Sequence, residues 1–123
     1  MIESGKKNVL ADKSYQFALK IVFLCKDLNA QKEYILSRQL LKCGTSIGAN
    51  VAEANGAISN ADFSAKISIA YKESLETKYW LKLLNDSNSI DENEFTELFK
   101  LADELSKILF SILKSTRMNK TGN

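Results

Sequence analysis

The chain has 123 residues, which is enough to bury one core but short for two, so we treat residues 1–123 as a single domain. Seventeen Lys and Arg residues against fifteen Asp and Glu leave a net charge of +2, which excludes nucleic-acid binding through overall charge alone. The chain has no histidine, so the commonest general base and the Ser-His and Cys-His nucleophile pairs are excluded as well.

The first predicted helix covers residues 12–28. The absence of proline and the small number of glycines favour uninterrupted helix. Apolar residues recur in this segment at spacings of three, four and seven, as on a helix that packs in a bundle. They are Leu10, Phe17, Ile21, Leu24 and Leu28. The N-terminal residues lack an apolar signal core and the longest apolar run is short, so we expect a cytoplasmic protein that does not contact a membrane.

The second predicted helix covers residues 35–55 and contains the stretch "KCGTSIGANVAEANGA". This stretch lacks the spacing and the lysine of a phosphate-binding Walker loop, and no predicted strand precedes it as a dinucleotide-binding loop requires. Gly44, Gly48 and Ala52 instead recur at every fourth position. Small residues in such a row let a neighbouring backbone approach closely, so we expect them to form a helix-packing contact.

A second row on this helix is polar and consists of Ser46, Asn50 and Glu53. The helical period places it beside the apolar positions, so we expect it to be buried at least in part. Two interpretations stay open. The row is either a hydrogen-bond network that fixes the register of the helices or a binding site on the flank of the bundle.

The third and fourth predicted helices cover residues 61–85 and 91–116, and residues 117–123 are expected to fray. Asp91 followed by Glu94 resembles a capping box at the start of the last helix. Short connections between helices of similar length make neighbours antiparallel. The sequence therefore predicts an all-α fold, an antiparallel up-down-up-down four-helix bundle.

The two cysteines, Cys25 and Cys43, lie within helical patterns and show no metal-binding spacing. We interpret both as small, reduced core residues. Glu73 and Glu76 form a carboxylate pair, but Lys72 and Lys78 lie close to them on the same helix, which is typical of a charged helix surface. We therefore expect no catalytic residues, metal, cofactor or small-molecule substrate.

Three segments together resemble a known family: "LSRQLLKCGTSIGANVAEANGA", "SNADFSAKISIAYKESLETKYWLKLL" and "SIDENEF". They are similar to the four-helix-bundle proteins encoded in intervening sequences of bacterial large-subunit ribosomal RNA genes. Relatives of that family include the accessory variability protein of diversity-generating retroelements. The resemblance extends from about Val9 to Thr116.

The resemblance implies a four-helix bundle that assembles as a ring-shaped homopentamer. It also implies association with RNA, or with a reverse transcriptase and its RNA, although most members have no assigned role. The retroelement proteins are strongly basic, whereas this chain is close to neutral.

Several large apolar side chains fall outside the predicted core positions. They are either an oligomer interface or part of a wide core that closes over them. The candidate interface residues are Phe23, Ile69, Leu75, Tyr79, Trp80 and Leu83.

Basic residues supply the candidate contacts to nucleic acid, although lysines of this kind are commonly only solvated surface. They are Lys6, Lys13, Lys20, Lys78, Lys82, Lys114, Arg117 and Lys120. We therefore expect a non-enzymatic homo-oligomer with an RNA-associated or reverse-transcriptase accessory role. The alternative is a protein-interaction scaffold with no nucleic-acid role, which the presence of only two arginines favours.

Overall fold

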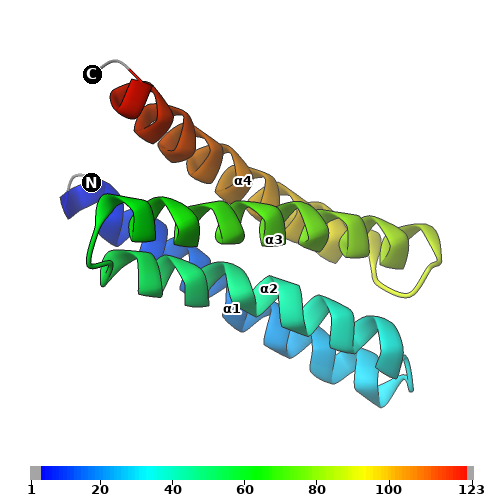
Figure 1. Ribbon diagram of the computed structural model, residues 1–123. Coiled ribbons are helices and arrows are strands. Elements are labelled where there is room, and N and C mark those ends of the chain that lie inside the picture. The colour runs from blue at the N-terminus through cyan, green and yellow to red at the C-terminus, as the bar shows by residue number, and fades with distance from the viewer. Residues whose placement is uncertain (1–3, 122–123) are drawn as a thin grey trace.

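Four helices form the structure. The computed structural model describes the backbone of residues 4–121 and the side chains of residues 9–116. The helices are α1 (Ser4–Ala30), α2 (Tyr34–Asn55), α3 (Asn60–Asp86) and α4 (Glu92–Thr121). They form an elongated bundle, and within the described residues no strand occurs (Figure 1). The all-α prediction is confirmed.

Each helix packs against two others: α1 and α3 both contact α2 and α4. Ion pairs between α1 and α4 show the relative direction of the first and last helices, because Lys13 pairs with Glu104 and Lys20 pairs with Glu97. Numbers that rise along α1 fall along α4, so these two helices are antiparallel. Among the four packed pairs, α1 and α4 contact each other least, and Figure 1 shows the C-terminal part of α4 diverging from α3.

Side chains fix the starts of two helices. The Ser59 hydroxyl accepts a hydrogen bond from the Asp62 backbone N–H at 3.0 Å, which caps α3. The Asp91 carboxylate accepts from the backbone N–H groups of Asn93 and Glu94 at 3.1 and 3.3 Å, which caps α4. The turns between helices are short, and the first and third contain Lys32 and Asn88 at positive φ.

Two helices are longer than predicted. α1 begins at Ser4 rather than at residue 12, and α4 continues to Thr121 rather than ending at 116. Helix α4 therefore includes residues 117–121 of the tail, whose fraying stays a prediction, and residues 122–123 lie outside the described part. The physical reason is that neither extension contains a proline, and isolated polar residues do not end a helix.

The core consists of the residues that the helical period selects. On α1 every predicted core position is buried, and on α3 the buried residues follow the predicted alternation of three and four. Three buried polar residues of the core are satisfied by hydrogen bonds: the hydroxyls of Ser74 and Ser106 lie 2.7 Å apart between α3 and α4, and Thr77 donates to the Glu73 carbonyl at 2.7 Å. Ile58, which continues the period of α2, is instead exposed, because α2 ends at Asn55.

Candidate functional surfaces

The glycines of α2 lie at its closest approach to α1. A Cβ atom added at Gly44 would lie 2.9 Å from Cγ2 of Ile21, and one added at Gly48 would lie 3.2 Å from the carbonyl oxygen of Ser14. Both distances are shorter than ordinary van der Waals contact. Ala52, the third member of the predicted row, is exposed. The backbones therefore approach at the two glycines, and the row opens to the surface at Ala52.

The polar row of α2 divides into a local hydrogen-bond pair and a surface ion pair. Asn50 is buried, and its Nδ2 donates to both the carbonyl oxygen and the hydroxyl of the half-buried Ser46, each at 2.9 Å. Glu53 is exposed and pairs with Lys66 of α3 at 3.2 Å. The expectation of burial is wrong for Glu53, because three positions along a helix turn it about 60° away from Asn50 and towards solvent.

Four lysines that were predicted to contact nucleic acid lie in ion pairs. The Nζ-to-carboxylate distances are 3.6 Å for Lys13 with Glu104, 3.0 Å for Lys20 with Glu97, 3.1 Å for Lys78 with Asp103, and 3.2 Å for Lys82 with Asp86. Lys114 has no ion pair among the described side chains. The side chains of Lys6, Arg117 and Lys120 lie outside the described residues. Acidic partners therefore offset the positive charge at most of the candidate sites that the structure places.

Five of the six predicted interface residues are exposed. The exposed fraction is 55% for Phe23 and 62% for Tyr79, and Ile69, Leu75 and Leu83 are exposed to a smaller extent. Trp80 is half-buried and donates from its ring nitrogen to Glu76 at 3.3 Å. A wide core therefore does not cover these five side chains within the described monomer. Their part in an interface stays a prediction.

Tyr15 and Leu19 are further exposed apolar residues of α1 that the sequence did not lead us to predict. Tyr15 is 64% exposed, and Leu19 is also exposed. Together with Phe23 they recur at every fourth position, on the side of α1 opposite to Ile21. This second spacing of four, interleaved with the core positions, is the signal that would have identified them.

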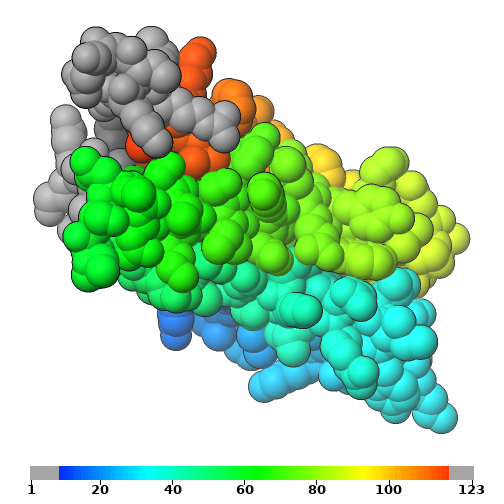
Figure 2. Space-filling model, in the orientation of Figure 1, coloured from blue at the N-terminus to red at the C-terminus, as the bar shows by residue number. Residues whose placement is uncertain are grey.

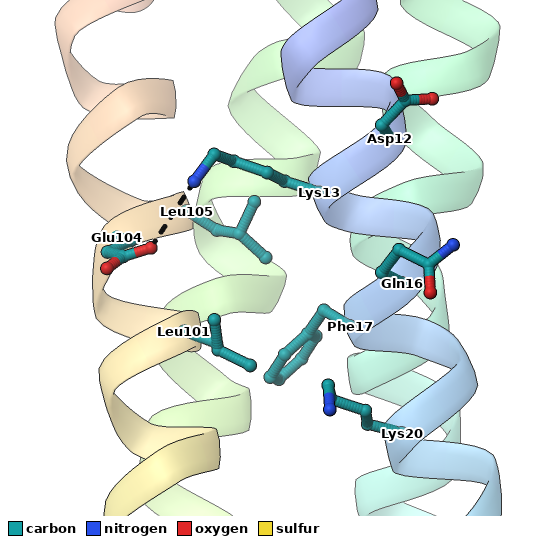
Figure 3. A pocket seen from close by; sticks show the side chains of 8 residues that line it. All are labelled: Asp12, Lys13, Gln16, Phe17, Lys20, Leu101, Glu104 and Leu105. Carbon is teal, nitrogen blue, oxygen red and sulfur yellow. Dashed lines mark ion pairs between the residues drawn. The ribbon is translucent and has the colours of Figure 1, made fainter.

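Among the described residues, two grooves border α1. The first, of about 210 Å³, separates α1 from α4. Figure 3 shows Phe17 directed from α1 towards Leu101 and Leu105 of α4, with the pair of Lys13 and Glu104 bridging the two helices. The second, of about 540 Å³, lies between α1 and α2. Its walls are Ala11, Asp12, Tyr15, Ala18, Thr45, Gly48, Ala49 and Ala52.

The carboxylate pair that the sequence analysis singled out, Glu73 and Glu76, lies on α3. Burial, and then the neighbouring Glu76, raise the pKa of Glu73. Across residues 9–116 no three His, Cys, Asp or Glu side chains cluster closely enough to hold a metal ion. None of the helices, as far as they are described, combines the length and apolar content of a membrane span.

Both cysteines are buried free thiols. The thiol of Cys25 donates to the Ser37 carbonyl oxygen at 3.4 Å, and the Ser37 hydroxyl donates to the Cys25 carbonyl oxygen at 3.2 Å. Cys43 lies between α2 and α3, where burial raises the pKa of its thiol to about 11. Because the thiolate is the reactive form, the structure describes two unreactive core residues.

We expect Cys43 to resist thiol reagents in the folded protein and to react readily after unfolding. The unfolded thiol has its ordinary pKa of 9.0, so it ionises before the folded one as the pH rises. The contribution of this group to stability is complete below about pH 9 and is lost between about pH 9 and 11. Labelling rates at pH 8, with and without denaturant, test the burial, with an exposed Ser111→Cys variant as the fast-reacting control. Labelling of native Cys43 at the control rate would contradict the prediction.

A family model described as 23S rRNA-intervening sequence protein matches residues 6–111. The chain belongs to this family. A solved structure from Bacteroides thetaiotaomicron, of a protein with unknown function from the S23 ribosomal protein family, is similar to this member at 48% sequence identity. The match has a TM-score of 0.85 and covers 89% of this chain and 98% of that one. No curated protein matches the chain.

Membership of the 23S rRNA-intervening sequence protein family confirms the resemblance drawn from the sequence motifs, and it agrees with the four-helix structure. The family description names a position within ribosomal RNA genes and no biochemical activity. The further relationship to retroelement accessory proteins stays a prediction.

Proposed function

We propose that this intervening-sequence protein is a non-enzymatic scaffold that assembles with copies of itself through its exposed apolar surfaces. The observation that supports this proposal best is the pair of exposed apolar rows on α1 and α3, which include Tyr15, Phe23 and Tyr79. Large apolar side chains that lie exposed next to one another often mark protein interfaces. The subunit count of five and the cytoplasmic location are parts of the same proposal, and the count comes from the family resemblance.

RNA association is the second candidate function. Lys72, Lys100 and Lys114 are exposed and have no acidic partner among the described side chains. Repetition of these charges around a ring would strengthen the field that one copy produces. The ion pairs at Lys13, Lys20, Lys78 and Lys82 favour the scaffold over this candidate, and a reverse-transcriptase accessory role stays a prediction from resemblance.

Light scattering on the purified protein, alone and with a mixed RNA pool at low and high salt, tests both candidates. We expect a mass of five subunits and no bound RNA. RNA binding that weakens steeply with salt would support the second candidate, because phosphate contacts release counterions. A monomeric mass at every concentration would contradict self-assembly.

A further inference from the structure

The exposed apolar rows of α1 and α3 have the same spacing. The α1 ridge consists of Tyr15, Leu19 and Phe23, and the α3 ridge consists of Leu75, Tyr79 and Leu83, so each advances by four residues at a time. All six side chains are exposed. Rows of this kind are the ridges that interlock when two helices pack. Figure 2 shows α3 uncovered across one face of the molecule.

The charges at the ends of the two ridges are opposite. Asp12 precedes the α1 ridge by three residues and Lys26 follows it by three, whereas Lys72 precedes the α3 ridge by three and Asp86 follows it by three. At about 100° per residue, the three ridge residues of each helix and the two charged residues that flank them fall within an arc of about 80°. All four charged side chains are exposed. Asp86 already pairs with Lys82 of the same helix at 3.2 Å, so Lys26 would approach it as a second cation.

The α1 ridge also borders a concave surface. Tyr15 lines the 540 Å³ groove between α1 and α2, whose opposite wall contains Ala49 and Ala52. Residues this small leave room for large side chains from outside. On α3, Tyr79 is the ridge residue with the largest exposed fraction. The chain therefore carries both an apolar groove and a protruding apolar ridge, on different helices.

We propose that the α3 ridge of one copy of this chain packs parallel to the α1 ridge of a second copy and against its α1–α2 groove. In this direction Asp12 faces Lys72 and Lys26 faces Asp86. In the opposite direction between the same two ridges, like charges would face each other, which is unfavourable. The proposal rests on self-assembly and identifies the surfaces through which it occurs.

The contact joins two different surfaces. Each copy binds one neighbour through its α3 ridge and a second neighbour through its α1 ridge and groove. Contacts of this type form closed rings when the rotation between copies returns to its start. The competing arrangement pairs like with like, α1 with α1 and α3 with α3, in antiparallel directions that also match charges. Such like-with-like contacts on two different faces would join copies into an open chain, unless further symmetry closed it. Closed assemblies are the common outcome, which favours the contact between different surfaces.

Mixing two surface variants separates these arrangements. Tyr79→Glu places a charge on the α3 ridge, and Ala49→Glu places one in the groove. Both positions are exposed, so the fold is expected to persist, which far-UV circular dichroism checks. Ser111→Glu, at an exposed position of α4 outside both surfaces, is the control and should keep the wild-type mass.

We expect each of the two variants alone to be monomeric and their equimolar mixture to form a complex of two subunits and nothing larger. The Ala49→Glu variant keeps its α3 ridge and the Tyr79→Glu variant keeps its groove. These two surfaces can bind each other once, and the altered surfaces left over cannot bind a third subunit. An Ala49→Glu variant that keeps the wild-type mass, or a folded mixture that stays monomeric, would overturn the proposed contact while leaving self-assembly intact. A monomeric wild-type protein would overturn both.

Charge exchange tests the direction of packing. Asp12→Lys alone should raise the protein concentration at which the assembly dissociates, because it faces Lys72. Adding Lys72→Asp to the same chain should restore the wild-type value. A double variant that dissociates at least as readily as the single variant would overturn the parallel direction.

Discussion

Replacing Phe17 with alanine is expected to lower the free energy of unfolding by about 3–5 kcal/mol. The ring is 1% exposed and lies between α1 and α4, beside Leu101 and Leu105 (Figure 3). These two helices contact each other least, so few other side chains are available to refill the space. The void would also join the 210 Å³ groove next to it. Denaturant unfolding followed by circular dichroism, at one fixed protein concentration, measures the loss.

Tyr34→Ala is the matched control for this substitution. Tyr34 is also aromatic, but it is 54% exposed at the start of α2. Its truncation should change the free energy of unfolding by no more than about 0.5 kcal/mol. Equal losses for both variants would show that the α1–α4 contact is not where Phe17 contributes to stability.

The second large effect is expected for Gly48→Leu, which should destabilise the bundle by about 1–3 kcal/mol. A Cβ atom added at this position would lie 3.2 Å from the carbonyl oxygen of Ser14. This atom belongs to the backbone of α1, which cannot move aside as easily as a side chain can. The remaining leucine atoms must then displace α1 or leave their preferred rotamers. The melting temperature, compared with that of wild type, reports the change.

Gly48→Ala separates the Cβ contact from the bulk of leucine. Alanine gains about 1 kcal/mol of helix propensity over glycine, which offsets the tight contact with Ser14, so we expect a nearly unchanged melting temperature. A leucine variant as stable as the alanine variant would contradict the close approach of the two backbones.

Much of the fold could be predicted because the core follows one rule. Spacings of three and four select residues such as Ile21, Ile67 and Leu105, and all three are buried. Helix ends were harder to predict. Contacts with the core fix the middle of a helix, whereas its ends depend on capping and on breakers, and the sequence offers no proline to mark them.

The surfaces were less predictable than the core. A helical period shows which residues leave the core, such as Phe23 and Tyr79, but it does not show which charges meet across helices. The partners of Lys13 and Lys20 lie on α4, more than seventy residues away, so their ion pairs depend on tertiary packing. The Glu53 side chain likewise finds Lys66 only when α2 and α3 are assembled.

The contact between α1 and α4, the smallest of the four helix contacts, has a consequence for folding kinetics. The three stronger contacts all join helices that follow one another along the chain, and only the α1–α4 contact closes a long loop. Native contacts that are mostly local in sequence lower the entropic barrier and favour rapid folding. During synthesis each new helix therefore meets a partner that has already left the ribosome, and the final closure requires the formation of only the smallest contact.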